Sequence, residues 1–424
     1  MLFAEIVSIG DELLIGQVIN TNASWMASEL NKNGIHVNRI SAISDDGDQI
    51  KTALTEAFGR AQIVLLTGGL GPTKDDITKH TLAAYFHSKM VFHEPTFAHI
   101  KALFGIRNYA LTDVNRLQAE IPEKCIPLKN LHGTAPGMWF EQDGRVAVSM
   151  PGVPFEMKTL MTEEVIPRLK EKFALGNIYH KTIMTHGLGE SALAERIATW
   201  ESALPATMKL AYLPQPGIVR LRLSVSGEQG EELKEAVHHQ CRQLIQLIPE
   251  LIFGFDDMLM EEVIGQYLIQ LGHTMSAAES CTGGYLSHLL TSIPGSSAYF
   301  NGSIVSYTNQ AKSKLLGVPA DIIAKHGAVS QEVVEAMAMG SRKQFSTDYA
   351  LAISGIAGPD GGTPEKPVGT VWIALATEKG VQSQLFNFGE HRGRNIRRSA
   401  LAALNMLRLE LKKQLLPKGE TCCN

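Results

Sequence analysis

The apolar run Ile63–Leu66 constrains the fold of this chain more than any other segment. Four consecutive apolar residues that lead into Thr67-Gly68-Gly69 are typical of a parallel strand covered on both faces. Strand-like and helix-like segments alternate around this run from residue 3 to about residue 172. The alternation predicts a three-layer α/β domain, with helices on both sides of one sheet.

Helix-boundary residues support this pattern. Asn22 is expected to cap a helix that Gly34 ends, because asparagine favours the cap position and glycine the position after a helix. Pro154 suits the first turn of a helix that continues to about residue 172. Further along the chain, apolar spacing predicts helices over 331–345 and 395–415.

A chain of 424 residues is long enough for two or three domains. The middle of the chain has the strand and helix order of a small α+β module, and the strand–helix alternation returns after residue 257. We therefore expect domains over 1–173, 177–255 and 257–415. The predicted fold class is α/β, with two three-layer α/β domains joined by a small α+β domain.

The charge of the chain argues against a nucleic-acid partner. The formal net charge is −4, and residues 177–256 hold seven Lys or Arg against nine Asp or Glu, a local charge of −2. A glycine loop in that segment ends in Glu190, where a phosphate contact would favour a cation. A spacer or dimerisation role is favoured for the middle domain. No signal peptide or membrane span is recognised, and we expect a cytoplasmic protein.

The segment 278–284 carries the strongest catalytic pattern. Ser280 and Cys281 stand at the end of an expected strand, and Gly283 and Gly284 open a helix whose N–H groups could stabilise an oxyanion or a phosphate. Lys312 follows 32 residues after Ser280. A lysine whose pKa is lowered by burial can act as the base that activates a serine. The pattern indicates a hydrolase with a Ser–Lys pair.

Other interpretations of these residues stay open at this stage. A serine before two glycines is often only a helix cap, and a single lysine is often a surface residue. Cys281 is a rival nucleophile, since a thiolate is more reactive than an alcohol near neutral pH. Arg394 lies in an arginine cluster that could hold a phosphate or simply form an exposed helix face.

A second candidate site follows the strand at Ile63–Leu66. Three glycines, Gly68, Gly69 and Gly71, form a turn suited to phosphate contact. Carboxylates that could bind Mg²⁺ or a similar ion are Asp45, Asp46, Asp75 and Asp76. The alternative is that paired aspartates simply cap helices.

The last third of the chain resembles the nicotinamide mononucleotide (NMN) deamidase domain of the CinA (competence/damage-inducible protein A) family. The resemblance rests on the segments AESCTGG, GSSAYFNGSIVSYTNQAK, HGAVS and SGIAGPDGGTPEKPVGTVW. It implies hydrolysis of NMN to nicotinate mononucleotide and ammonia without a cofactor. It also makes Ser280 the nucleophile, Lys312 the base and Tyr307 a catalytic neighbour. The residues that it places around the substrate are Ser297, Asn309, Ser354 and Arg394, with Gly283 and Gly284.

The first third resembles the molybdopterin-binding-type (MoCF) domain of the same family. Its matching segments are IGDELLIGQVINTNA, TGGLGPTKDDIT, APGMWF and MPGVPFEM. This resemblance implies an ADP-ribose pyrophosphatase that depends on a divalent metal, Mg²⁺ or Co²⁺, and yields AMP and ribose 5-phosphate. Asp11, Asn20 and Asn22 are expected to flank its pocket. The middle segment resembles the KH-like linker of the family, and the family resemblance suggests a homodimer.

Three functional hypotheses follow. The first is a bifunctional hydrolase of pyridine-nucleotide salvage that acts on NMN and ADP-ribose. The second keeps the deamidase but makes the first domain a nucleotide or pterin binder without turnover, because fold alone does not choose a substrate. The third is a competence or DNA-repair accessory protein, which requires a basic face and salt-sensitive DNA binding.

Overall fold

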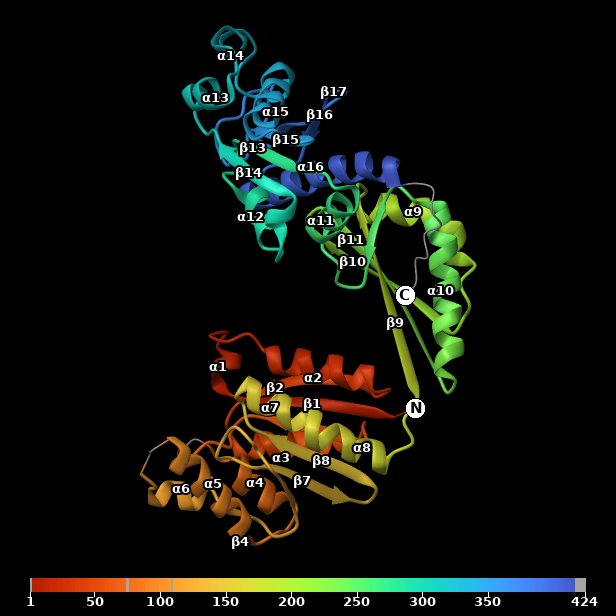
Figure 1. The fold of residues 1–424 in the computed structure, drawn as a ribbon. Helices are drawn as coiled ribbons and strands as arrows, with labels where there is room; N and C mark the ends of the chain where they lie inside the picture. Colours follow the sequence, from red (N-terminus) through yellow and green to blue (C-terminus); the bar gives the residue numbers. More distant parts are fainter. Residues whose placement is uncertain (1, 74–75, 108–109, 416–424) are drawn as a thin grey trace. The chain divides into compact units, whose positions relative to one another are not determined.

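The computed structural model describes residues 2–73, 76–107 and 110–415 (Figure 1). The chain divides into two compact units, one made of residues 1–179 with 226–233 and the other of residues 180–225 with 234–424. Within the described residues, no helix is both long and apolar enough to cross a bilayer.

The first unit is built on a six-stranded sheet in the order β2-β1-β3-β8-β7-β6. Strands β2, β1, β3 and β8 are parallel, whereas β7 runs antiparallel to β8 and β6 antiparallel to β7. The strands of this unit are β1 (Phe3–Ile9), β2 (His36–Ile43), β3 (Ile63–Thr67), β6 (Ile126–Leu128), β7 (Gly137–Gln142) and β8 (Arg145–Met150), with a separate pair β4 (Met90–Phe92) and β5 (Glu120–Pro122).

Helices cover both faces of this sheet, as the alternation predicted. In β3, Ile63 and Leu65 belong to one apolar core, and Val64 and Leu66 belong to a second core on the opposite face. The first core includes residues of α2 and α7, and the second includes residues of α3 and α4. The helices are α1 (Asp11–Leu14), α2 (Thr21–Lys32), α3 (Gly47–Phe58), α4 (Thr78–Tyr85), α5 (Glu94–Arg107), α6 (Asp113–Leu117), α7 (Pro154–Leu160) and α8 (Ile166–Lys172).

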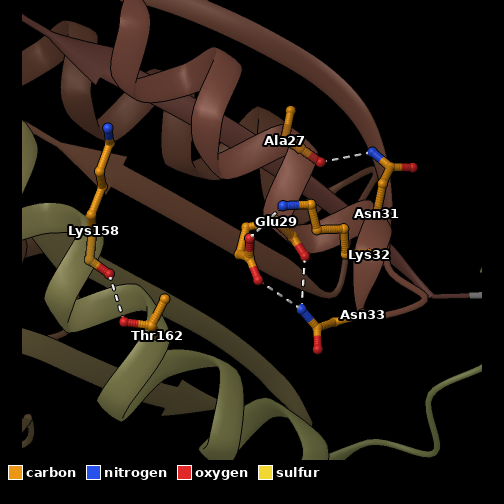
Figure 2. Close-up of polar contacts among 7 residues, drawn as sticks. All are labelled: Ala27, Glu29, Asn31, Lys32, Asn33, Lys158 and Thr162. Carbon is orange, nitrogen blue, oxygen red and sulfur yellow. Dashed lines mark hydrogen bonds and ion pairs between the residues drawn. The ribbon is translucent and has the colours of Figure 1, made fainter. Parts of the chain in front are cut away.

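The carboxyl end of α2 is closed by side chains of its own last turn (Figure 2). Asn31 Nδ2 donates to the carbonyl oxygen of Ala27 at 2.8 Å, and Asn33 Nδ2 donates to that of Glu29 at 2.8 Å. Lys32 forms an ion pair with the Glu29 carboxylate at 3.3 Å. The bond from Asn33 satisfies the carbonyl group of Glu29, one of the last four of the helix, which have no backbone partner within it.

Two helix boundaries differ from the sequence-based prediction. The cap of α2 is Asn20, whose side chain accepts a hydrogen bond from Ala23 N at 3.2 Å, so Asn22 lies inside the first turn. The helix expected from Pro154 to residue 172 contains a π-helical turn at Met161–Val165 between α7 and α8. Pro167 explains this turn, because proline has no N–H to continue an α-helical ladder.

The second unit contains a four-stranded sheet in the order β10-β11-β9-β12 and a five-stranded sheet in the order β14-β13-β15-β16-β17. The middle domain supplies β9 (Asn177–His186), α9 (Glu190–Ser202), β10 (Met208–Gln215), β11 (Ile218–Gly227), α10 (Gly230–Leu247) and β12 (Ile252–Phe255). This is the small α+β module that the sequence predicted.

In the five-stranded sheet, β14, β13 and β15 are parallel and β16 and β17 are antiparallel. Its strands are β13 (Met275–Glu279), β14 (Phe300–Val305), β15 (Tyr349–Gly355), β16 (Thr370–Thr377) and β17 (Gly380–Asn387). One apolar core joins it to α11 (Met260–Leu271), α12 (Tyr285–Thr291) and α16 (Arg392–Leu415), and another joins it to α13 (Asn309–Leu316), α14 (Ala320–His326) and α15 (Gln331–Phe345). The carboxy-terminal domain is therefore also a three-layer α/β domain, which confirms the predicted fold class.

The middle and carboxy-terminal domains share one apolar core. Met184, Ile218 and Phe253 pack in the same cluster as α11 and α16. Arg408, which is 1% exposed, donates to the carbonyl oxygens of Ile252 at 2.9 Å and of Glu250 at 2.5 Å. A buried guanidinium with these partners fixes α16 against the end of β12.

Candidate active site

Ser280 and Lys312 meet at the carboxyl ends of the parallel strands. Lys312 Nζ donates to Ser280 Oγ at 2.8 Å and to the carbonyl oxygen of Ser306 at 2.8 Å. Lys312 is 1% exposed and Ser280 is 9% exposed. Thr308 caps α13 by accepting from Ala311 N, and this cap starts the helix so that Lys312 lies in its first turn.

The environment of Lys312 favours the neutral amine. Burial lowers the pKa of Lys312 below 10.5, because desolvation disfavours the charged form. The described part of the chain provides no carboxylate in an ion pair with this amine. A neutral amine has a lone pair with which it can accept the proton of a serine hydroxyl.

Cys281 is adjacent in sequence but differs in reactivity. Its side chain is 7% exposed, and burial raises the pKa of the thiol to about 12. The thiol is therefore protonated near neutral pH, and a protonated thiol is a weak nucleophile. The structure favours Ser280 over Cys281 as the attacking group.

The amino end of α12 is occupied by a carboxylate of the same turn. Glu279, which is 0% exposed, accepts hydrogen bonds from the N–H groups of Gly284 at 3.1 Å, Leu286 at 3.0 Å and Ser287 at 2.9 Å. The Ser287 hydroxyl also donates to it. The expectation that this helix end offers free N–H groups to a ligand is therefore corrected.

The turn itself still offers two backbone donors. Gly283 and Gly284 have φ angles of +62° and +99°, which glycine adopts without strain. The N–H groups of Ser280, Gly283 and Gly284 have acceptors in the protein, whereas those of Cys281 and Thr282 donate to no other described residue. An unused N–H immediately after a nucleophile is where hydrolases place an oxyanion donor.

Two predicted neighbours of the pair lie beside it. Ser280 N donates to Ile353 O at 3.0 Å, which places the next residue, Ser354, next to the nucleophile turn. Ser354 is 1% exposed and donates to Ala328 O at 2.7 Å. Tyr307 directly follows Ser306, whose carbonyl oxygen accepts a hydrogen bond from Lys312, and Tyr307 is 58% exposed.

The arginine beside Tyr307 is not the predicted one. Arg392 donates to the Tyr307 hydroxyl at 3.2 Å and to Gly358 O at 2.7 Å. Arg394 instead lines a cavity with residues of the middle domain. The cause is helical geometry: two positions correspond to about 200° around an α-helix, so side chains at 392 and 394 point to opposite sides of α16.

Two other predicted residues form no hydrogen bond with the pair in the described structure. Ser297 lies before β14, whose first residue Phe300 pairs with Met275 at the start of β13, so the structure places it at the opposite end of the strands from Ser280. Asn309 is the first residue of α13 and is exposed. The structure does not bring the Ser297 side chain into the group around Ser280.

The sequence analysis assigned no role to Glu279, and within the arginine cluster it favoured Arg394 over Arg392. Glu279 stands inside the recognised AESCTGG segment, and an acid shortly before a helix is a detectable signal, because negative charge is favourable at the amino end of a helix. Choosing Arg392 rather than Arg394 from the sequence would have required knowing where α16 begins. The helix begins at residue 392, whereas the sequence predicted a start at residue 395.

In the first unit, a turn that contains Gly68 and Gly69 directly follows β3. Gly68 and Gly69 have φ angles of +118° and +63°. A side chain at Gly69 would place its Cβ atom 2.1 Å from Thr78 Oγ1, so the turn requires glycine there. Thr78 is fully buried and its hydroxyl has no partner in the described structure. At Gly71, a Cβ atom would lie 2.5 Å from the Asp76 carboxylate.

The predicted metal ligands are not equivalent. Asp46 caps α3 by accepting from Asp48 N and Gln49 N, and the Asp76 carboxylate accepts from Thr73 N and the Thr73 hydroxyl. Asp45 Oδ2 accepts from Asp11 N at 3.1 Å.

The described residues contain no cluster of three His, Cys, Asp or Glu suited to a metal ion, and Asp75 lies outside them. Asp45 and Asp76 can supply the one or two carboxylates that Mg²⁺ needs when substrate phosphates complete its coordination.

The predicted flanking residues meet the turn through side-chain hydrogen bonds. Asn22 Nδ2 donates to Gly152 O at 2.7 Å and to Thr67 Oγ1 at 3.3 Å, and its Oδ1 is buried without a partner. Asn20 exchanges hydrogen bonds with the Ser8 hydroxyl. The glycine turn is thus bordered by two buried polar atoms, Asn22 Oδ1 and Thr78 Oγ1, that a polar ligand could satisfy.

The chain matches three family models that define its class. They are described as the probable molybdopterin binding domain at residues 5–171, the damage-inducible protein CinA KH domain at residues 180–254 and the CinA C-terminal domain at residues 257–411. The three models follow one another in the order that the sequence analysis predicted.

Full-length relatives identify the family. A CinA-like protein of Cytophaga hutchinsonii is 48% identical over 97% of this chain and 99% of its own length, and one of Flavobacterium psychrophilum is 48% identical over 97% and 99%. The chain belongs to the CinA-like protein family. A solved structure of competence/damage inducible protein CihA from Agrobacterium tumefaciens is 38% identical and covers 36% of this chain and 95% of that chain, with a TM-score of 0.34.

Proposed function

We propose that the carboxy-terminal domain hydrolyses the amide of NMN to nicotinate mononucleotide and ammonia. The observation that supports this most is the buried 2.8 Å contact between Lys312 Nζ and Ser280 Oγ. A serine paired with a desolvated lysine is suited to acyl transfer. The choice of NMN as substrate rests on the resemblance of residues 257–415 to the deamidase domain.

The first half of the reaction forms an ester on Ser280. Lys312 Nζ takes the proton of the Ser280 hydroxyl while Oγ attacks the amide carbon. The N–H groups of Cys281 and Thr282 stabilise the resulting oxyanion. Lys312 then gives the proton to the amide nitrogen, and the C–N bond breaks to release ammonia. The second hydrogen bond of Lys312 Nζ, to the carbonyl oxygen of Ser306, keeps the amine directed at the Ser280 hydroxyl.

The second half returns the enzyme to its starting state. Once ammonia has left, the acyl group of nicotinate mononucleotide is held as an ester on Ser280, and a water molecule attacks the ester carbon. Lys312 accepts a proton from this water and passes it to Ser280 Oγ as the ester bond breaks. The product leaves as a carboxylate, and the enzyme needs no cofactor in either half.

The test of this function is NMN-dependent ammonia release by the full-length protein. Ser280→Ala and Lys312→Ala should each lose about 10³-fold or more in kcat, because a nucleophile and its base act as a unit. Cys281→Ala is the matched control and should retain most of the activity. Full activity in Ser280→Ala would remove the assignment.

For the amino-terminal domain we propose metal-dependent hydrolysis of ADP-ribose to AMP and ribose 5-phosphate. The buried unpartnered atoms beside the turn at Gly68 to Gly71 support a polar ligand there. Asp45 and Asp76 would hold a divalent ion together with the diphosphate, and the ion would supply charge stabilisation at phosphorus.

Chromatography of ADP-ribose incubated with the protein and Mg²⁺ or Co²⁺ tests this activity. Asp45→Asn should slow hydrolysis, and Asp48→Asn, an exposed position on α3, is its control. Intact ADP-ribose with every metal would leave the domain as a nucleotide or pterin binder. Together the two activities would make the protein a bifunctional salvage hydrolase. We also propose a homodimer, which sedimentation analysis tests.

A further inference from the structure

A cavity of about 530 Å³ lies between the middle domain and α16, within the second unit. The loop between β9 and α9 lines this cavity, and so do Arg394 and Arg398 of α16. These arginines are one helical turn apart, so they share a face of α16. Arg392, beside Tyr307, lies on the other face.

Gly189 and Glu190, at the amino end of α9, also line this cavity. The helix has 13 residues, and its cap, Gly189, provides no side-chain hydrogen bond. The N–H groups of Glu190, Ser191 and Ala192 donate to no described residue. Unused amides and the helix dipole make this end attractive to an anion.

His186 is an independent sign of a missing partner. Its side chain is 9% exposed and lines the cavity, and its Nδ1 is buried without a hydrogen-bond partner. Burial, with the positive charges of Arg408 and Arg398, lowers the pKa of His186 to about 4. The ring is therefore neutral at pH 7 and can donate from one nitrogen. A buried polar atom left unpaired is costly, and a ligand could relieve that cost.

The charge and the apolar wall indicate the kind of ligand. Arg394 and Arg398 contribute two positive charges and Glu190 contributes one negative charge, so the net charge of the cavity lining is positive. The charge count over residues 177–256 covers only the middle domain, whereas Arg394 and Arg398 belong to the carboxy-terminal domain. Phe386 and Phe388, whose rings stack at 5.3 Å between centroids, add an apolar surface.

We propose that this cavity binds a mononucleotide, with its phosphate at the amino end of α9 between Arg394 and Arg398. The volume is within the range of roughly 300–1,000 Å³ found for small-molecule sites. The phosphate would accept from the α9 amides and the guanidinium groups, and the rest of the ligand would contact the phenylalanine wall. This site is separate from the Ser280 site and does not depend on the proposed deamidase activity.

Hydrogen exchange measured by mass spectrometry on the full-length protein tests the site directly. AMP should slow exchange of the amides of residues 186–193, and adenosine at the same concentration should not. Site-resolved exchange separates this effect from AMP bound to the first domain. Protection by adenosine equal to that by AMP, or no protection by AMP at millimolar concentration, would overturn the proposal. Protection by a single-stranded oligonucleotide but not by AMP would also overturn it.

Gly189→Asp is the decisive variant. Gly189 has φ −75° and ψ 165°, and a Cβ atom there meets nothing within 4 Å, so the fold accommodates a side chain. Aspartate is a good helix cap, so folding is preserved while its carboxylate takes the amides and repels a phosphate. The AMP concentration for half-protection should rise about tenfold or more. Gly189→Ala, the neutral control, should leave it within about threefold. Equal affinity in Gly189→Asp and wild type would contradict the site.

A second pair of variants tests the arginine wall. Arg398→Gln should weaken AMP protection by about tenfold or more, because it removes a charged donor. Arg397→Gln makes the same charge change on the same helix but at a residue that does not line the cavity, and it should have little effect. Equal weakening by both substitutions would show that only the general charge of α16 matters, and the site would be rejected.

Discussion

Lys312 Nζ lies 2.8 Å from Ser280 Oγ, although the two residues are 32 positions apart in the sequence. The contact exists because Ser280 directly follows β13 while Lys312 lies in the first turn of α13, the helix that follows the neighbouring parallel strand β14. Carboxyl ends of parallel strands share one edge of the sheet, so the two segments meet there. The reactivity of the pair then depends on the protonation state of the amine.

The pH dependence of activity should report the pKa of Lys312. The base is active when it is neutral, so kcat/KM for NMN should rise with pH through this pKa and then level off. Because burial lowers the pKa from 10.5, the rise should be complete at a lower pH than an exposed lysine would allow. A stopped assay of ammonia across pH 5–11 measures the profile. A midpoint at or above 10.5 would contradict a desolvated base.

Lys312 should also reduce the stability of the fold. Its pKa is lower in the folded than in the unfolded chain, so the unfolded chain binds more protons between the two values and stability rises with pH there. Lys312→Met removes this dependence and should raise the free energy of unfolding at pH 7 by about 1 kcal/mol. Urea unfolding at pH 7 and pH 10 measures both values. A variant less stable than wild type at pH 7 would argue against a neutral buried amine. The same would follow if the variant and wild type differed in unfolding free energy by as much at pH 10 as at pH 7.

Glu279→Gln should damage both stability and turnover. The carboxylate accepts four hydrogen bonds around the nucleophile turn, and an amide places donors against some of the same N–H groups. We expect the free energy of unfolding to fall by about 2–3 kcal/mol and kcat to fall with little change in KM. Glu378→Gln, at an exposed turn, should change stability by less than about 0.5 kcal/mol. Equal effects of the two substitutions would contradict the role of Glu279 in positioning the turn.

Arginine substitutions should distinguish the two faces of α16. Arg392 bonds the Tyr307 hydroxyl beside the pair, whereas Arg394 lines the cavity at the middle domain. Arg392→Ala should lower kcat/KM for NMN by about 10–100-fold, and the loss in Arg394→Ala should be clearly smaller. Steady-state kinetics of the two variants provide the comparison. A larger loss in Arg394→Ala would restore the sequence-based assignment.

Local patterns made the fold largely predictable from the sequence. The run at Ile63–Leu66 is buried on both faces, and the helix expected over 331–345 is α15, Gln331–Phe345. In both cases the apolar spacing within one segment carries the information. The cap at Asn20 rather than Asn22 shows where this reasoning loses accuracy, since two similar residues compete for one boundary.

The candidate site was less predictable, because its details depend on contacts between segments. Short motifs were sufficient to select Ser280 and Lys312. The choice between Arg392 and Arg394 depends on where α16 begins, and a shift of two residues reverses the direction of a helical side chain. The unpartnered His186 depends on packing between two domains, which no local pattern encodes.

Rapid acid quenching of the wild-type protein with NMN, followed by peptide mass spectrometry, tests the central claim most directly. The account predicts the acyl group of nicotinate mononucleotide, with its ribose phosphate, on Ser280 during turnover, and no such adduct in Ser280→Ala or Lys312→Ala. An adduct on Cys281, or ammonia released by Ser280→Ala at the wild-type rate, would contradict it.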